Sequence, residues 1–212
     1  AHTARAMRQM TDEADSLRKA YGVSPHYMAQ EELRQHGLGG PWHGAMTLPI
    51  GFALNPRKYH SGLAAAASHA GARLYSHTPV IRLSRKEGGW VLSTPQGVLS
   101  ARKEILATNG YSSEDLPNWM RARSLPVLSS VIVTRPLTEA EKQAQGWQSR
   151  QMCYDTRTLL HYFRLLPDDR FLFGMRGGLR STPSAQAAIS KRIRRNFHRL
   201  FPAWRAVEIT HE

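Results

Sequence analysis

Residues 161–176 read His-Tyr-Phe-Arg-Leu-Leu-Pro-Asp-Asp-Arg-Phe-Leu-Phe-Gly-Met-Arg. Two runs rich in aromatic and aliphatic residues flank residues 167–169, Pro-Asp-Asp, which are residue types that favour a tight turn. We therefore predict a β-hairpin with strands over 158–166 and 170–176. Because a hairpin is the unit of an antiparallel sheet, and helical patterns flank it, the sequence indicates an α+β fold.

The hairpin pattern also predicts which residues face each other. A turn centred on the two aspartates would oppose three pairs: Leu165 with Leu172, Phe163 with Gly174, and His161 with Arg176. Opposed residues point to the same side of a sheet, so we expect His161 and Arg176 to share one face, with Tyr162 on the other. Two cationic groups opposed across a sheet repel each other. Either an anionic or electron-rich group lies over the pair, or both side chains are solvated at an exposed sheet edge. The pattern leaves both explanations open.

Helical patterns lie on both sides of this hairpin, over residues 1–21, 29–35, 56–70 and 184–200. The third is the best marked, because Asn55 can cap its free amides, Pro56 suits the first helical position and Gly71 lies just past its end. A three-stranded β-meander follows it over 78–106. Further extended runs are expected near 45–54, over 127–134 and at the end of the chain.

The net charge of +13 is the unusual bulk property of these 212 residues. Such an excess favours nucleic acid, an acidic membrane surface or an acidic substrate as partner, unless the charge is simply spread over a solvated surface. On the helix expected over 184–200, the basic residues fall opposite an apolar stripe formed by Ile189, Ile193, Phe197 and Leu200. A solvated helix face is therefore favoured over a nucleic-acid-binding module, and we expect no nucleic-acid partner.

Other bulk features restrict the class of protein. No apolar run approaches the roughly 20 residues that span a bilayer, and the first residues lack the hydrophobic stretch of a signal peptide. Cys153 is the single cysteine, so no internal disulfide is expected, and the cytoplasm is the expected location. The histidines show no spacing typical of metal ligands, and we expect no metal site. An uncapped helical pattern at one end and a strand at the other suggest an interior portion of a longer chain.

Residues 104–111, Glu-Ile-Leu-Ala-Thr-Asn-Gly-Tyr, raise a separate question. Asn-Gly is a strong signal for a two-residue hairpin turn, yet the residues that follow do not alternate as a returning strand would. The other use of such a glycine is to let another group approach the main chain closely. We therefore treat Gly110 as a candidate ligand contact.

An ordered set of short stretches then carries a resemblance to a known family. They are Gly44-Ala45, Asn55-Pro56, Gly62-Leu-Ala-Ala-Ala66, Thr78-Pro79-Val80, Ala107-Thr-Asn-Gly-Tyr111, Asp155-Thr-Arg157, His161-Tyr-Phe-Arg164, Phe173-Gly-Met-Arg-Gly-Gly178 and Ile209-Thr-His211. In this order they resemble the FAD-dependent oxidoreductases of the D-amino-acid oxidase type, and within them the γ-glutamylputrescine oxidoreductase branch. No single stretch is specific, but the set spans residues 44–211.

The resemblance also implies a domain organisation. Residues 1–44 would be a helical segment at the domain junction, 45–122 part of the FAD-binding domain, and 123–212 a truncated substrate-binding domain built on the antiparallel sheet. The family opens with a G-x-G-x-x-G turn that receives the pyrophosphate of FAD, and none of the sixteen glycines here has that spacing. We therefore expect this chain alone to hold FAD weakly or not at all.

The resemblance implies roles for two sets of residues. Thr78 and Val80 would contact the adenine, and residues 107–110 (Ala107, Thr108, Asn109 and Gly110) would pass beside the ribose and pyrophosphate. On the hairpin, Arg176 would bind a substrate carboxylate. His161 and Tyr162 are pocket candidates on opposite faces, so at most one of them is expected to line the pocket.

The implied reaction is oxidation of a small-molecule amine, in which hydride passes from the carbon beside the nitrogen to flavin and the imine is hydrolysed. The expected substrate is γ-glutamylputrescine or a similar carboxylate-bearing amine, with a D-amino acid, glycine or sarcosine as alternatives. Cys153 does not match a position where this family attaches flavin, so no covalent link through it is expected.

Overall fold

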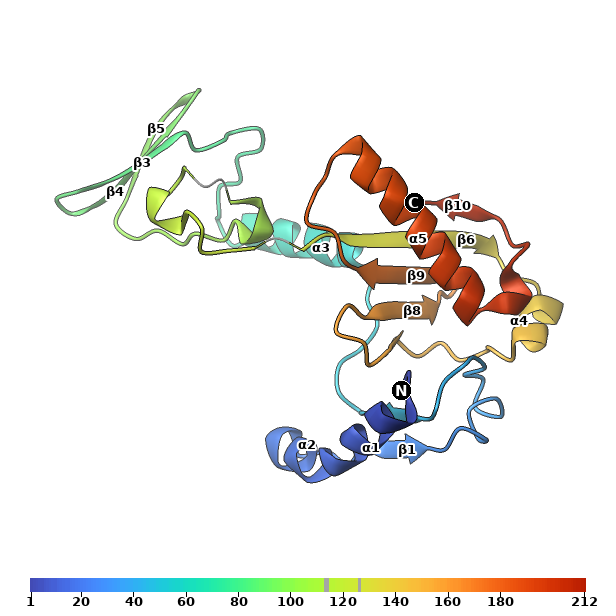
Figure 1. Cartoon of the computed structure of the whole chain (residues 1–212). Helices are drawn as coiled ribbons and strands as arrows, with labels where there is room; N and C mark the ends of the chain where they lie inside the picture. Colours follow the sequence, from blue (N-terminus) through green and yellow to red (C-terminus); the bar gives the residue numbers. More distant parts are fainter. Residues whose placement is uncertain (113–114, 126) are drawn as a thin grey trace. The chain divides into compact units, whose positions relative to one another are not determined.

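The computed structural model describes residues 1–112, 115–125 and 127–212 (Figure 1). The chain divides into two compact units. The sheet unit comprises Ala1–Ala53 and Val127–Glu212, and the meander unit comprises Leu54–Pro126. The segment predicted as 1–44 therefore groups with the C-terminal sheet, and the meander unit covers most of the segment predicted as 45–122.

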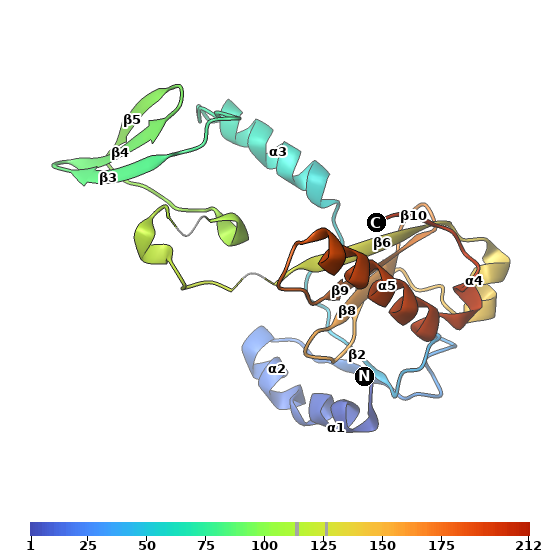
Figure 2. The same ribbon diagram turned by 45° about the horizontal axis from the view of Figure 1, so that its top comes forward.

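The sheet unit contains a five-stranded antiparallel sheet in the order β10-β6-β9-β8-β7. The strands are β6 (Ser129–Pro136), β7 (Cys153–Tyr154), β8 (His161–Leu165), β9 (Arg170–Arg176) and β10 (Ile209–His211). The central hairpin, β8 and β9, is the predicted one. Helix α5 (Pro183–Leu200) lies across one face of this sheet (Figures 1 and 2). The predicted α+β class is confirmed.

The pairing within the hairpin differs by one residue from the prediction. His161 pairs with Met175 instead of Arg176, and Tyr162 pairs with Gly174. The cause is the turn, which holds three residues instead of two: the Leu166 amide donates to the Arg170 carbonyl (2.8 Å), and Asp169 is left-handed with φ 61°. Because a one-residue shift exchanges the faces of a strand, His161 and Arg176 lie on opposite faces.

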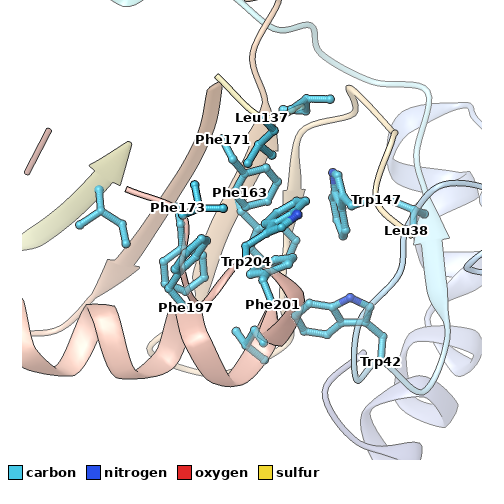
Figure 3. Packing of buried hydrophobic residues seen from close by; sticks show 14 of the residues in the cluster. Leu38, Trp42, Leu137, Trp147, Phe163, Phe171, Phe173, Phe197, Phe201 and Trp204 are labelled. Carbon is cyan, nitrogen blue, oxygen red and sulfur yellow. The ribbon is translucent and has the colours of Figure 1, made fainter. Parts of the chain in front are cut away.

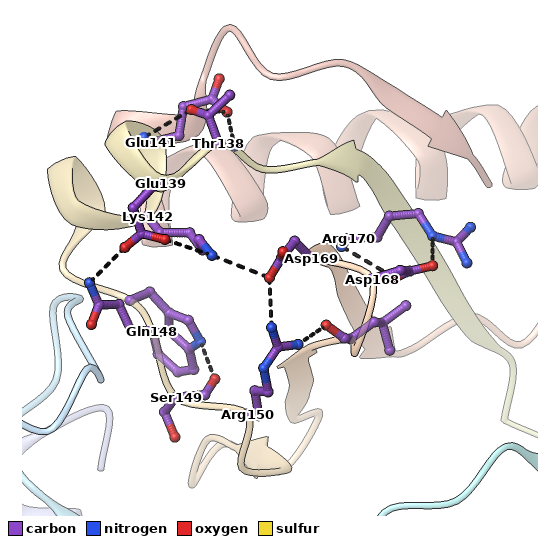
Figure 4. A network of polar contacts seen from close by, with 12 residues as sticks. Thr138, Glu139, Glu141, Lys142, Gln148, Ser149, Arg150, Asp168, Asp169 and Arg170 are labelled. Carbon is purple, nitrogen blue, oxygen red and sulfur yellow. Dashed lines mark hydrogen bonds and ion pairs between the residues drawn. The ribbon is translucent and has the colours of Figure 1, made fainter.

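Ion pairs hold this turn in place (Figure 4). The Asp169 carboxylate accepts from Lys142 (3.2 Å) and from Arg150 (2.7 Å), while Arg170 pairs with Asp168 (2.8 Å). The hydrogen bond from Lys142 lowers the pKa of Asp169, and the hydrogen bond and charge of Arg150 act in the same direction. The left-handed residue is thus fixed by groups outside the hairpin.

Lys142 belongs to α4 (Glu139–Gln145), a helix that the sequence analysis missed. The Thr138 side chain accepts from the Glu141 amide, and the Glu141 carboxylate accepts from the Thr138 amide. This capping box was readable in the sequence as Thr-x-x-Glu, followed by Gly146 in the left-handed conformation at the end of the helix.

Aromatic side chains fill the core between the sheet and α5 (Figure 3). Phe201 is fully buried and its ring lies 4.9 Å from Phe171 and 5.2 Å from Trp204. The predicted apolar stripe of α5 is confirmed, because Ile193, Phe197 and Leu200 are buried and Ile189 packs against the cluster. Basic residues line a shallow depression of about 570 Å³ on this helix and its C-terminal flank: Lys191, Arg194, Arg195, His198, Arg199 and Arg205.

The N-terminal part of the sheet unit departs from the predicted helices. The pattern over 1–21 forms two helices, α1 (Ala4–Asp12), capped by the Thr3 side chain, and α2 (Ala14–Tyr21), closed by left-handed Gly22. The helix predicted over 29–35 is wrong. Residues 30–37 form successive turns that bury Leu33. These turns lie in the connection between β1 (His26–Met28) and β2 (Ala45–Thr47), which pair with each other.

The meander unit contains α3 (Pro56–His69) and the strands β3 (Arg82–Lys86), β4 (Gly89–Thr94) and β5 (Gly97–Ala101). The predicted helix start is confirmed, because the Asn55 side chain accepts from the Lys58 amide (3.1 Å). Short 3-10 turns follow at Asn109–Tyr111 and Asn118–Met120. None of the residues of α3 is buried. Over the ranges that the structure describes, no helix is long and apolar enough to cross a membrane.

A buried polar cluster ties β8 to α5. The Asp155 carboxylate accepts from the ring Nδ1 of His161 (2.7 Å) and from its amide (3.1 Å), and it pairs with the Arg157 guanidinium. The His161 ring stacks on Phe173 at 5.2 Å, and its Nε2 lies 3.0 Å from the side-chain amide of Asn196. With Nδ1 donating to Asp155, Nε2 accepts from Asn196, so every polar atom of the imidazole is paired.

Replacing Phe201 by alanine tests the aromatic core. The change removes a fully buried ring from the centre of the cluster, so we expect the free energy of unfolding to fall by about 3–5 kcal/mol in urea titrations followed by tryptophan fluorescence. Phe52→Ala is the control, because Phe52 is 75% exposed and its loss should change the value by less than about 0.5 kcal/mol. Equal effects of the two substitutions would contradict this packing.

The Asp155 cluster predicts a pH dependence. Burial alone would raise the pKa of Asp155, but the hydrogen bonds from His161 and the Arg157 charge outweigh it and hold the pKa below its ordinary value. A lowered pKa stabilises the fold above the unfolded-state value of about 3.9, and this contribution is lost as pH falls through the lower folded-state value. The stability advantage of the unsubstituted chain over Asp155→Asn should therefore shrink between pH 6 and pH 3.

The control for that measurement is Asp168→Asn, which removes a half-exposed carboxylate on the hairpin turn. Urea unfolding curves at each pH give the free energies. Parallel curves for the unsubstituted chain and Asp155→Asn over the whole range would show that the cluster carries no such linkage.

Candidate functional site

The candidate site lies on the face of the five-stranded sheet opposite α5, which we call the open face. The register places on it Ser129, Val131, Tyr154, Tyr162, Gly174 and Arg176, together with Val133, Arg164 and Leu172 nearer the hairpin turn. The other face carries His161, Phe163, Phe171, Phe173 and Met175, all of which are buried. Strand alternation therefore separates a packed face from a face that is at least partly exposed within the sheet unit.

Tyr162 has an unusual position on the open face. It lies directly opposite Gly174 on β9, and a Cβ at Gly174 would overlap the Tyr162 ring. The phenol therefore lies across β9, and its hydroxyl comes within 2.7 Å of the Ser129 hydroxyl on β6. The missing side chain of Gly174 makes this path across the sheet possible.

Arg176 completes a polar group at this end of the face. It lies directly opposite Ser129 on the neighbouring strand, and it is exposed. Within the described residues its guanidinium makes no hydrogen bond or ion pair. The pairing of β6, β9 and β8 thus brings together the Ser129 and Tyr162 hydroxyls and, among the described residues, a guanidinium without a partner. Such a set of donors suits a carboxylate, because the planar guanidinium can bind both of its oxygens.

The structure places the predicted pocket residues on different faces. The predicted alternation of His161 and Tyr162 is confirmed, whereas the predicted pairing of His161 with Arg176 is wrong. Tyr162 and Arg176 share the open face. His161 is buried against Phe173, and both of its ring nitrogens are hydrogen-bonded. It therefore lies on the opposite face of the sheet from Tyr162 and Arg176.

Two residues of the open face were missed by sequence reasoning. Tyr154 is directly opposite Tyr162 and is 66% exposed, but its strand, β7, contains only two residues and gives no periodic signal. Ser129 lies within the predicted strand 127–134. Its contact with Tyr162 depends on the order of β6, β9 and β8 in the sheet, which a single strand pattern does not specify.

A cavity of about 950 Å³ lies beside β7 in the sheet unit. Its lining combines α1, α2 and the segment after β2 with residues 151–157, among them Tyr154 and Cys153. Burial raises the pKa of the Cys153 thiol to about 12, so the thiol is protonated at neutral pH and is a poor nucleophile. Among the described residues, no three of the His, Cys, Asp and Glu side chains converge as metal ligands would.

The residues predicted to contact FAD lie in the meander unit. Thr78 and Val80 precede β3, and residues 107–110 follow β5, so the two segments leave opposite ends of the antiparallel meander. The Asn-Gly pair forms a 3-10 turn with Asn109 left-handed (φ 50°), not a hairpin. Apart from Gly110 itself and its two chain neighbours, no atom of the described chain lies within 4 Å of the place where a Cβ of Gly110 would stand. This open main chain fits the close approach of a ligand.

Comparison with known proteins identifies the family. The family model for DAO, FAD dependent oxidoreductase, matches residues 1–212. The chain is 30% identical over 212 residues to a protein named "Probable oxidoreductase OrdL" of Rhizobium meliloti, covering 99% of this chain and 48% of that protein. It is 28% identical over 143 residues to the gamma-glutamylputrescine oxidoreductase of Escherichia coli, covering 67% of this chain and 33% of that protein.

A solved structure supports the fold. The glycine oxidase of Geobacillus kaustophilus superposes with a TM-score of 0.61 at 15% identity, covering 97% of this chain and 63% of that one. The chain spans about half the length of the first relative it matches. The family model matches the chain along all its residues, and the fold agrees with it. The chain therefore belongs to the DAO family of FAD-dependent oxidoreductases.

Proposed function

We propose that the protein is an FAD-dependent oxidoreductase that oxidises the carbon beside the nitrogen of a carboxylate-bearing amine, with γ-glutamylputrescine as the leading substrate. Membership of the DAO family and the relative from Escherichia coli support this proposal. The single observation that carries it is the group of donors on the open face. Arg176, whose guanidinium has no partner among the described residues, lies opposite Ser129, and Ser129 contacts the Tyr162 hydroxyl.

Each residue of this group would have a separate task. Arg176 would bind the substrate carboxylate in a bidentate manner, which fixes one end of the substrate. Its positive charge would also disfavour the ammonium form of the substrate, and hydride loss requires the neutral amine. The Tyr162 hydroxyl would donate to the same carboxylate while it accepts from the Ser129 hydroxyl. The Tyr154 ring would cover the adjoining carbon chain from water.

The meander unit would serve the cofactor. Thr78 and Val80 would contact the adenine, and residues 107–110 would run beside the ribose and pyrophosphate. Bound FAD would supply the hydride acceptor, which no side chain of this chain can replace. Since the sequence contains no G-x-G-x-x-G turn, we propose that these residues add to the binding of FAD and do not hold it alone.

A smaller amino acid is the second candidate substrate. The donors at Arg176 and Tyr162 would bind the carboxylate of glycine or of a D-amino acid as well as that of a glutamyl group. The two classes differ in the distance between carboxylate and amine, and comparing turnover of γ-glutamylputrescine with that of glycine separates them.

Replacing Arg176 by methionine tests the proposed substrate site. Loss of a charge-assisted bidentate contact, at about 2–3 kcal/mol, should lower kcat/KM for γ-glutamylputrescine by about 30- to 150-fold in the flavin-loaded protein. Turnover of putrescine, which has no carboxylate, should change far less. Equal losses for both amines would remove Arg176 from the substrate site.

Arg170→Met is the matched control. Arg170 lies on the same strand and the same face, six residues away at roughly 20 Å, and it pairs with Asp168. The control removes one positive charge from the sheet without touching the group at Arg176. It should leave the ratio of kcat/KM for the two amines unchanged.

Replacing Gly110 by alanine tests the proposed cofactor contact. A Cβ at Gly110 would meet no atom of the described chain, so the free energy of unfolding of the chain should stay the same. If FAD lies against the main chain there, the added methyl group should weaken FAD binding to the full-length protein about tenfold, as measured by flavin fluorescence titration. Gly97→Ala is the control, because a Cβ there is equally free of contacts and Gly97 lies on the meander turn. Unchanged FAD affinity in Gly110→Ala would refute the contact.

A further inference from the structure

We infer that Ser129 and Gly174 are positioning residues that fix the Tyr162 phenol across the sheet, so that its hydroxyl and the Arg176 guanidinium act on one and the same carboxylate. This inference rests on the proposed function. It assigns a task to two residues that never touch the reacting atoms and that sequence reasoning did not connect with Tyr162.

The sheet geometry makes Gly174 necessary for this arrangement. Tyr162 is on β8 and Ser129 is on β6, so β9 lies between them and the two outer strands are roughly 10 Å apart. A tyrosine side chain can cross that gap only if its ring lies flat on the middle strand. Gly174 stands directly opposite Tyr162 on that strand, where any side chain would collide with the ring.

Ser129 then fixes the position of the Tyr162 hydroxyl. Its Oγ lies 2.7 Å from the Tyr162 hydroxyl, which selects the orientation across β9 over an orientation towards solvent. Ser129 is also the direct cross-strand neighbour of Arg176. A phenol held by Ser129 therefore lies next to the strand position that carries the guanidinium.

A packing role alone does not account for these contacts. The open face of the sheet unit is partly exposed, and the Arg176 guanidinium makes no hydrogen bond or ion pair within the described ranges. A tyrosine packed for stability would not need a hydroxyl partner two strands away. The polar end of the face combines a neutral donor held by a hydrogen bond with an exposed charged one, and this combination discriminates a carboxylate from a neutral group.

The experiment follows Tyr162 directly in the flavin-loaded protein. Tyrosines labelled with ¹³C at Cζ are observed by NMR, and the Tyr162 signal is identified by its loss in Tyr162→Phe. Acetate is the carboxylate probe, and its Kd is read from the shift of the Tyr162 signal. We expect Ser129→Ala and Gly174→Ala each to move this signal before acetate is added, and to weaken acetate binding at least fivefold.

Two variants serve as controls. Ser129→Thr keeps the hydroxyl and should restore both the signal and the acetate Kd. Ser130→Ala makes the same chemical change one residue along β6, on the opposite face of the sheet, and should behave like the unsubstituted protein. Because Ser129→Ala creates no overlap, it decides the question even if Gly174→Ala fails to fold.

The outcomes separate this inference from the proposed function. If Arg176→Met weakens acetate binding while Ser129→Ala changes neither the Tyr162 signal nor the Kd, the positioning role is wrong and the carboxylate site stands. If acetate leaves the Tyr162 signal of the unsubstituted protein unmoved, both are wrong.

Discussion

The turn at residues 167–169 is the constraint on which the rest of the site depends. Asp169 adopts the left-handed conformation, and its carboxylate is held by Lys142 and Arg150 from outside the hairpin. This adds one residue to the loop and sets the pairing of β8 with β9. Since the side-chain period of a strand is two, the turn determines which side chains of β9 share the buried face with β8 and which share the open face.

That division gives the two faces of the sheet different physical characters. The face under α5 is buried and largely aromatic, and the polar cluster around Asp155 and His161 has its hydrogen bonds satisfied internally. The open face is partly exposed and gathers Tyr162, Ser129 and Arg176. A stable hydrophobic core on one side allows unpaired donors on the other, which is a common way to position a binding group on a rigid element.

Individual helices and strands were predicted from the sequence more reliably than the pairing and packing between them. The hairpin, α3 and α5 were found because each has strong local signals: turn residues, an Asn-Pro helix start and a regular apolar stripe. The hairpin register was missed because a two-residue and a three-residue loop fit the same Pro-Asp-Asp. Only the αL conformation of Asp169 distinguishes them, and it depends on cations from α4 and from the loop before β7.

The candidate site shows the same limit. Tyr162 and Arg176 were named from the family resemblance, whereas Ser129 and Tyr154 emerge only from the order of strands. His161 was paired with Arg176 by the assumed register, and the one-residue shift places Arg176 on the face of the sheet opposite His161. For the meander unit, the sequence identified the helix and three strands. The significance of Gly110 still depends on a cofactor and not on any contact within the chain.

The most direct test of this account is the register itself. In a Cys153→Ala background, cysteines at positions 164 and 172 occupy directly opposed strand positions, about 5.5 Å apart between Cα atoms, which suits a disulfide. We predict that this pair oxidises within one molecule, whereas cysteines at 165 and 172, opposed under a two-residue turn, stay reduced. A disulfide between 165 and 172, with none between 164 and 172, would contradict the assignment of Tyr162 and Arg176 to the open face.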